Sequence, residues 1–214
     1  MKLEAITFIK TKSMRITLST KKHLPILRLN SDLRSSFPIW DFWKLKQLEK
    51  TGLHLRGLGV NAWIYELPRG WYLPPFSLKG KIVLDLGACC GETAYYFLQN
   101  GACKVVCVEC DPEYIKLLEE NKKNLNLNIE IVAERFNLKH LQISHDFIKC
   151  DIDSGEVDLL PIAEHLKPCV LEVHTPNLRN QFEKKGFHVI QKFKGDKDAC
   201  IMVNYEAPLR KEVK

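Results

Sequence analysis

The stretch that most constrains this chain is Lys81–Thr93 (KIVLDLGACCGET), which passes from an apolar strand through a glycine-bracketed turn to the start of a helix. Its first part, interrupted only by Asp85, is typical of a central parallel strand that is covered on both faces. Gly87 and Gly91 enclose three small residues, so the backbone can turn sharply and approach a ligand closely. A helix from Glu92 to about residue 100 would present its free N–H groups to that ligand. The stretch therefore predicts a loop that binds a nucleotide-like ligand.

The spacing of the glycines distinguishes between kinds of nucleotide site. A dinucleotide-binding loop needs G-x-G-x-x-G, but counting from Gly87 those positions hold Cys89 and Glu92, and a glutamate would repel a pyrophosphate. A Walker loop is excluded because no Gly-Lys-Ser/Thr follows. The remaining pattern, hhhDhGxxxG, resembles motif I of class I S-adenosylmethionine-dependent methyltransferases, in which the loop surrounds the methionine part of the cofactor. A related α/β fold that binds another nucleoside is the alternative. The resemblance assigns these residues to the cofactor site: Asp85, Gly87, Ala88, Cys89 and Gly91.

A second acidic position agrees with this interpretation. The apolar stretch Lys104–Val108 predicts another buried strand, and Glu109 follows it, 22 positions after Gly87. An acid about 20 positions after the loop, at the tip of the second strand, is suited to bind two ribose hydroxyls. We place the next residue, Cys110, in the cofactor site as well. Glu134, after the third expected strand, could bind the adenine amino group or could be a solvated loop residue.

The rest of the chain predicts an α/β fold. Strands and helices alternate after residue 80, and the last two strands form an antiparallel hairpin around residues 194–198. The class I resemblance implies a Rossmann-like, seven-stranded, mostly parallel sheet, because periodicity alone does not order strands. We divide the chain into an N-terminal α+β extension, residues 1–78, and a methyltransferase domain, residues 79–214. The expected elements of the domain are strands 82–86, 104–108, 128–133, 147–152, 169–174, 187–193 and 199–205, and helices 92–100, 112–124 and 178–185.

The N-terminal extension differs in charge and aromatic content from the rest of the chain. Residues 1–80 contain 14 Lys and Arg against 5 Asp and Glu, whereas residues 81–214 contain 18 against 21. All four tryptophans also lie in the first part. The extension could be an acceptor-binding cap for an anionic or nucleic-acid substrate, or its aromatic residues could dock it on the core while its basic residues are solvated. Within it we expect strands in residues 8–18, a helix over 40–53, and a hairpin formed by 60–65 and 70–73.

Length and composition fit one ordinary domain with an extension. The chain has 214 residues, 45% of them hydrophobic, which is enough for a sizeable core. It has no apolar run of eighteen residues, and its N-terminal stretch lacks the apolar core of a signal peptide. We therefore expect a cytoplasmic protein without a membrane segment. Most of the eight cysteines lie in expected strands or in the glycine loop, which predicts reduced, buried thiols and neither disulfides nor a zinc site.

The fourth expected strand gives information on the methyl acceptor. Methyltransferases that modify a base nitrogen have an Asn/Asp-Pro-Pro-aromatic turn after this strand, and this chain has no Pro-Pro there. The sequence resembles instead the K-x-D-x-E-G-x-E element of FkbM-type methyltransferases: Lys149, Asp151 and Glu156 match, while Asp153 replaces a glutamate. VLEVHT is similar to that family's strand-five E-x-H element, and Cys89 stands where its glycine loop usually has asparagine. The resemblance implies O-methylation of a small or carbohydrate-like hydroxyl acceptor.

The ends of strands four and five supply the candidate catalytic residues. A hydroxyl acceptor has to lose its proton, which requires a base or a metal. Glu172 and His174 point to the same face of strand five, and His174 is either the base or a structural, hydrogen-bonded histidine. Asp151 could bind the amino group of the cofactor, and Asp153 or Glu156 could orient the acceptor. The same acids could form a magnesium or manganese site, but cofactor binding and helix capping account for them without a metal.

Two functions follow from these observations. The first is an S-adenosylmethionine-dependent O-methyltransferase, whose partner we expect to be a small-molecule or carbohydrate acceptor in preference to RNA. The alternative is an RNA-binding protein or RNA methyltransferase that uses the basic N-terminal section.

Overall fold

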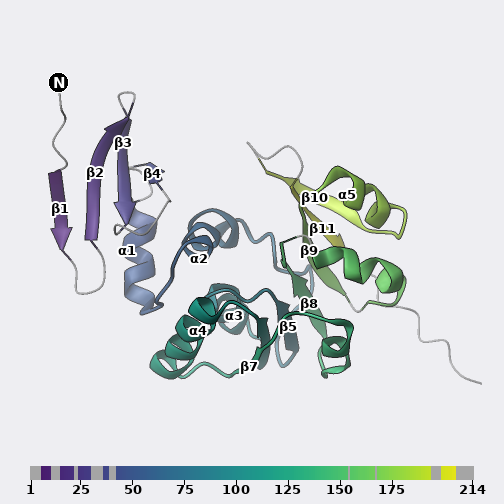
Figure 1. Cartoon of the computed structure of the whole chain (residues 1–214). Helices are drawn as coiled ribbons and strands as arrows, with labels where there is room; N and C mark the ends of the chain where they lie inside the picture. The colour runs from purple at the N-terminus through teal and green to yellow at the C-terminus, as the bar shows by residue number, and fades with distance from the viewer. Residues whose placement is uncertain are drawn as a thin grey trace, which may run out of the picture.

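The computed structural model describes residues 42–153, 155–166, 168–193 and 199–205, together with the backbone of four strands within residues 6–38. The expected hairpin loop at 194–198 therefore lies outside the described residues. Figure 1 shows two separate sheets, one near the N-terminus and one formed by the rest of the chain.

A seven-stranded sheet forms the larger part, in the order β10-β11-β9-β8-β5-β6-β7 (Figure 1). Neighbouring strands from β9 to β7 are parallel, whereas β11 is antiparallel to both β9 and β10. This topology confirms the expected Rossmann-like, mostly parallel sheet with a C-terminal antiparallel hairpin. The strands are β5 (Ile82–Leu86), β6 (Lys104–Glu109), β7 (Ile129–Ala133), β8 (Phe147–Cys150), β9 (Cys169–Val173), β10 (His188–Lys192) and β11 (Cys200–Asn204).

The central strands are buried on both faces, as their apolar sequences predict. Successive side chains of a strand point to opposite faces, so Leu84 and Leu86 pack in one apolar cluster and Val83 in the other. Helices α3 and α4 contribute Phe97 and Leu118 to the cluster around Val83. The opposite face is covered by α5 and by the 3-10 helices η4 and η5. The bounds are α3 (Glu92–Gln99), α4 (Pro112–Leu125), η4 (Leu138–Gln142), η5 (Gly155–His165) and α5 (Pro176–Glu183).

The N-terminal part contains a four-stranded antiparallel sheet in the order β1-β2-β3-β4, followed by helix α1. The helix runs over Phe42–Thr51, inside the range expected from the sequence. The strands are β1 (Ile6–Lys10), β2 (Arg15–Lys21), β3 (Leu24–Leu29) and β4 (Ser36–Pro38).

The hairpin expected from residues 60–65 and 70–73 is wrong, because the chain is helical from Leu58 to Arg69. Val60, Ile64 and Leu67 are buried, and their spacing of four and then three residues places them on one face of a helix. The β-branched and aromatic residues suggested strands, but packing against the core overrides that propensity. The segment comprises α2 (Leu58–Asn61), the π-helical turn η2 (Ala62–Glu66) and the 3-10 turn η3 (Leu67–Arg69).

The segment before β5 packs directly on the sheet. Leu67, Tyr72 and Leu78 belong to the same apolar cluster as Val83, and Phe76 packs edge-on against Phe147 of β8 with ring centroids 6.0 Å apart. These contacts place the last part of the extension beside the central strands, where it can reach the ends of β8 and β9.

All eight cysteines lie in the described residues and are free thiols, five of them buried. The expected burial holds for these five, whereas the reduced state of the cysteines stays a prediction. In the part of the chain that the structure describes, no helix is long and apolar enough to cross a membrane.

Candidate active site

The glycine loop follows β5 and has an unusual backbone. Gly87, Cys89 and Gly91 have φ angles of 75°, 47° and 87°, all in the left-handed region. The N–H groups of Gly87 and Ala88 donate to the carbonyl oxygen of Val108, which ties the loop to the end of β6. A Cβ atom at Gly87 would lie 1.8 Å from the carbonyl oxygen of Asp151. The loop therefore lies directly against the end of β8, and only glycine fits at its first position.

A buried ion pair between Asp85 and Lys149 holds the first residue of the loop. The ammonium group of Lys149 lies 3.2 Å from Asp85 Oδ1 and donates to the carbonyl oxygen of Gly87 at 2.7 Å, and Thr93 donates to the other oxygen of Asp85. Burial raises the pKa of Asp85, whereas Lys149 and Thr93 lower it. Burial lowers the pKa of Lys149, but Asp85 and Asp151 outweigh it, so Lys149 stays charged. Asp85, assigned from the sequence to the cofactor site, thus lies beneath the loop and positions it.

Glu109 connects the loop to the start of α4. Its carboxylate accepts hydrogen bonds from the N–H groups of Cys89 at 2.8 Å, Cys110 at 2.7 Å and Asp111 at 2.9 Å. The structure therefore brings together three residues that the sequence assigned to one site. Among the described residues Cys89 is the one backbone donor to Oε2, which leaves one acceptor position on that oxygen.

Glu134 lies after β7 and is exposed. Its carboxylate forms an ion pair with Lys139 at 2.6 Å and lies 3.3 Å from Nε2 of His140. The Lys139 ammonium is the main cause that lowers the pKa of Glu134. The adenine-binding role of Glu134 stays a prediction, and its neighbours are those of a solvated ion pair.

The candidate catalytic residues meet at the ends of β8 and β9. His174 Nε2 lies 3.4 Å from Glu172 Oε1, and His174 Nδ1 lies 3.7 Å from Glu156 Oε1. Asp151, Glu156 and His174 each offer one ligand atom, and these three atoms lie within 4.8 Å of one another. Glu172 is the main cause that raises the pKa of His174 to about 9. At neutral pH such an imidazole favours its charged form, so it must lose the Nδ1 proton before it can accept a proton or bind a cation.

Two further residues of this group, Glu66 and Tyr72, lie in the extension, and the sequence analysis assigned no function to them. The hydroxyl of Tyr72 lies 2.6 Å from Glu172 Oε2 and 2.8 Å from Glu66 Oε2. One hydroxyl proton cannot serve two carboxylates, and burial together with Glu172 raises the pKa of Glu66, so a protonated Glu66 completes the arrangement. The one sequence signal is that Glu66 is the sole acidic residue between Thr51 and Leu84.

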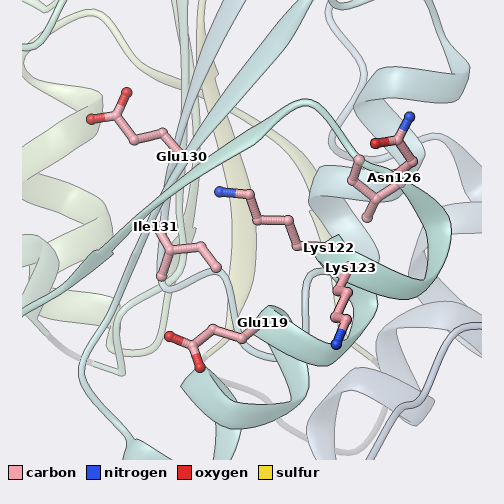
Figure 2. Close-up of a pocket in the computed structure, with 7 residues that line it drawn as sticks. Glu119, Lys122, Lys123, Asn126, Glu130 and Ile131 are labelled. Carbon is pink, nitrogen blue, oxygen red and sulfur yellow. The ribbon is translucent and has the colours of Figure 1, made fainter.

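A separate cavity lies between the C-terminal half of α4 and strand β7. Figure 2 shows its lining, in which two lysines and two glutamates of α4 and β7 surround the opening. None of the predicted site residues lines it, so it is distinct from the candidate active site. The lining residues are Glu119, Lys122, Lys123, Asn126, Leu127, Glu130 and Ile131.

Comparisons with known proteins identify a matching protein family and a relative. A model described as FtsJ-like methyltransferase matches residues 72–210. Ribosomal RNA small subunit methyltransferase G of Mycoplasmopsis pulmonis is 33% identical over 112 residues, which are 50% of this chain and 48% of that protein. This chain therefore spans about half the length of that relative.

Solved structures with a similar fold include a methylase and a protein bound to S-adenosyl-L-methionine. Ribosomal protein L11 methylase of Lactobacillus delbrueckii subsp. bulgaricus has a TM-score of 0.49 and 20% identity, covering 60% of this chain and 71% of its own. Fibrillarin of Aeropyrum pernix, solved with natively bound S-adenosyl-L-methionine, has a TM-score of 0.47 and 12% identity, covering 94% of this chain and 98% of its own.

Proposed function

Because this chain belongs to the FtsJ-like methyltransferase family, we propose that it transfers the methyl group of S-adenosylmethionine to a hydroxyl group of an RNA. Family membership confirms the expected class of enzyme and its cofactor, S-adenosylmethionine. The acceptor and the roles of individual residues are the proposed part.

The expected preference for a small-molecule or carbohydrate acceptor over RNA is wrong. The curated relative that matches half of this chain is named for methylation of ribosomal RNA. The charge of the first 80 residues, 14 basic against 5 acidic, supports an anionic substrate of this kind. The likeness of a few short elements to FkbM-type enzymes stays a prediction, since the family model that matches is the FtsJ-like one.

The residues of the glycine loop fit S-adenosylmethionine. Because Gly87 has no side chain, the loop can lie directly against the end of β8. Glu109 Oε2 has one acceptor position left, which a ribose hydroxyl can occupy. We propose that Gly87, Ala88, Cys89, Gly91, Glu109 and Cys110 bind the cofactor, with Asp85 and Lys149 holding the loop in place. When bound, the cofactor supplies an electrophilic methyl group.

One observation carries the proposal: the glycine loop follows β5, the group around His174 lies at the ends of β8 and β9, and Asp151 at the end of β8 lies between the two. Ligands of open α/β sheets bind at this edge. A hydroxyl oxygen placed between them would face the methyl donor on one side and carboxylates on the other. Transfer to oxygen requires loss of the hydroxyl proton, for which the carboxylate of Glu172 is the acceptor. RNA offers such a hydroxyl on its ribose.

The extension contributes residues that contact the group expected to face the methyl acceptor. Tyr72 and Glu66 hold Glu172 through a hydrogen-bond chain, so the extension orients a group that faces the acceptor. We propose that residues 1–78 form the acceptor-binding cap of the domain formed by residues 79–214.

The test is methyl transfer by the full chain from S-adenosylmethionine labelled in its methyl group. Unmodified ribosomal RNA, transfer RNA and a panel of small hydroxylated compounds serve as acceptors. Nuclease digestion followed by mass spectrometry of the nucleosides identifies the methylated atom. A 2′-O-methylated nucleoside is the expected product, and Glu172→Gln should reduce its formation about 100-fold or more, the range typical for a residue that receives a proton.

Two results would contradict the proposal. Label found on a base nitrogen or carbon would overturn the hydroxyl acceptor while leaving RNA as substrate. Transfer to small compounds alone would overturn RNA. Glu164→Gln is the matched control, since this exposed carboxylate pairs with Lys185 and has no assigned role in the site.

A further inference from the structure

Three potential metal ligands converge at the acceptor side of the site. Asp151 follows β8, Glu156 lies in η5 and His174 follows β9. One ligand atom of each lies within 4.8 Å of the other two. Ligand atoms of a bound divalent cation are separated by about 3 to 4 Å, because each lies about 2.1 Å from the ion. A small movement of these side chains would therefore create a coordination site.

Two atoms of this group are buried without a hydrogen-bond partner among the described residues. Glu156 is completely buried, and although its Oε1 accepts from the N–H of Ile152 at 3.1 Å, its Oε2 has no partner. Nδ1 of His174 is also without one. A buried polar atom left in this way destabilises a protein, so such atoms usually contact a protein group, a water molecule or an ion. A cation between Glu156 and His174 would satisfy both atoms.

The second nitrogen of His174 has the environment of a metal-bound histidine. Nε2 lies 3.4 Å from the carboxylate of Glu172, which is itself bonded to the hydroxyl of Tyr72. A histidine that binds a metal through one ring nitrogen commonly donates the other N–H to a carboxylate, which fixes the ring and its tautomer. The chain therefore contains the ligands and also the residues that would orient one of them.

We propose that Asp151, Glu156 and His174 bind a divalent cation, Mn²⁺ in preference to Mg²⁺. Two carboxylates and one imidazole suit Mn²⁺, whereas Mg²⁺ prefers oxygen ligands throughout. Three protein ligands leave positions open for water or for an oxygen of the acceptor.

The role of the cation rests on the proposed function, whereas its binding does not. A hydroxyl bound to a divalent cation is more acidic. Its O–H bond breaks, and the proton passes to the carboxylate of Glu172. The oxygen then forms a bond to the methyl carbon as the carbon–sulfur bond breaks, and the sulfur leaves as a neutral thioether. No oxidant or further reactant is needed.

Mn²⁺ binding to the full chain, without cofactor or RNA, is the test. Electron paramagnetic resonance measures free Mn²⁺ during a titration, and pulsed spectra detect a nitrogen ligand. One Mn²⁺ per chain with ¹⁴N coupling is the expected result. Glu156→Gln and His174→Gln should each lower the affinity at least a hundredfold, and His174→Gln should remove the coupling. Glu172→Gln should lower the affinity about 10- to 100-fold, the range typical for a residue that orients a metal ligand.

Cys90→Ser is the control, because Cys89, Cys90 and Glu92 form the second group of possible ligands within the described residues. This variant should bind Mn²⁺ like the wild type. Circular dichroism and melting curves establish that each variant is folded. The proposal is overturned if the folded wild type does not bind Mn²⁺. It is also overturned if folded Glu156→Gln and Glu172→Gln bind Mn²⁺ as tightly as the wild type, or if Cys90→Ser is the one variant that loses binding. A failure of RNA methylation with Mn²⁺ binding intact would count against the proposed function alone.

Discussion

Cys89 holds a backbone conformation that few residues adopt. Its φ of 47° lies in the left-handed region, where asparagine and glycine are much better tolerated than cysteine. We predict that Cys89→Asn raises the free energy of unfolding by about 0.5–1 kcal/mol, because it relieves local strain without the added chain entropy of glycine. Urea denaturation measures the change. Cys110→Asn, a neighbouring exposed cysteine outside the left-handed region, is the control and should have little effect; an equal gain in both variants would rule out backbone strain as the cause.

Gly87 is limited by space as well as by backbone conformation. Its φ is 75°, and a Cβ atom would lie 1.8 Å from the carbonyl oxygen of Asp151. Gly80 has nearly the same φ, 74°, but open space at its Cβ position. We predict that Gly80→Ala destabilises by about 1–2 kcal/mol, the cost of the conformation alone, and that Gly87→Ala destabilises by about 3 kcal/mol or more and weakens cofactor binding. Thermal unfolding and calorimetric titration with S-adenosylhomocysteine measure both effects. Equal destabilisation in the two variants would show that the proximity of Asp151 has no influence.

Residue spacing was enough to find part of the site. Gly87 and Glu109 stand at positions fixed by a strand, a loop and a helix of ordinary length, so their proximity could be predicted from the sequence. The contact of Tyr72 with Glu172 could not, because it joins residues 100 positions apart through a segment whose helical structure was missed. Lys149 matched a family element, but its bond to the loop depends on the pairing of β8 with β5.

Helix α4 is joined to the extension and to the loop by one buried side chain. Asn121 accepts from the N–H of His54 at 2.7 Å and donates to the carbonyl oxygens of His54 at 2.9 Å and Cys90 at 2.8 Å. We predict that Asn121→Ala destabilises by about 2–4 kcal/mol, because it leaves these backbone groups without partners. Asn124→Ala, at an exposed position of the same helix, should change stability by less than about 0.5 kcal/mol.

The same variant tests whether the loop depends on the extension. Amide hydrogen exchange should increase around Cys90 and His54 together in Asn121→Ala and stay unchanged in Asn124→Ala. Exchange that increases around His54 alone would show that the loop is held by other contacts.

The strands that are most deeply buried were the easiest to predict from the sequence. The central strands are covered on both faces, so their continuous apolar runs identified them. The crossover after β8 was missed because η5 contains Pro161, which removes a backbone donor and interrupts the pattern of an ordinary helix. A strand over 60–65 is predicted because its β-branched and aromatic residues favour strands, although the spacing of Val60, Ile64 and Leu67 is helical.

The order of strands belongs to the whole molecule and was not available from periodicity. Local patterns identified the strands from β5 to β11, but only the family resemblance implied a seven-stranded, mostly parallel sheet, and the order of its strands comes from the structure. The acceptor was also beyond the sequence pattern, because short elements near Asp151 and His174 resembled one family while the larger part of the chain matched another.

Glu92 makes the stability of the whole molecule depend on pH. It begins α3 and is almost completely buried, and a Cβ atom at Gly59 of α2 would lie 2.9 Å from its Oε2. Burial raises its pKa to about 8, and the nearby carboxylates of Asp85 and Glu66 add to the increase. The hydrogen bond from its own backbone N–H and the charge of Lys149 lower the pKa but do not outweigh burial. The folded pKa is above the unfolded value, so the contribution of this group is fully present below pH 4.5 and is lost as pH rises through about 8.

We therefore predict that Glu92→Gln becomes progressively more stable than the wild type between these pH values. The difference should change by up to about 1.4 kcal/mol per pH unit and should level off above pH 8. Urea denaturation at several pH values measures it. Glu119→Gln, at an exposed position of α4, should run parallel to the wild type. A constant difference for Glu92→Gln would mean that Glu92 is already ionised in the folded state.

The uneven charge of the chain gives the last prediction. Lys10, Arg15 and Arg28 lie in three adjacent strands of the N-terminal sheet, and the register pairs Lys10 with Arg15. If the extension binds RNA phosphates, replacing all three by alanine should weaken binding and reduce the slope of log K against log salt by about 0.7 for each phosphate that is no longer neutralised. Filter binding of a single-stranded RNA at several salt concentrations measures the slope. The control replaces three exposed lysines of the other part, Lys116, Lys184 and Lys192, and removes the same charge. Equal changes in both variants would show that only the net charge of the chain matters. A change confined to the first variant would place the RNA phosphates on the N-terminal sheet.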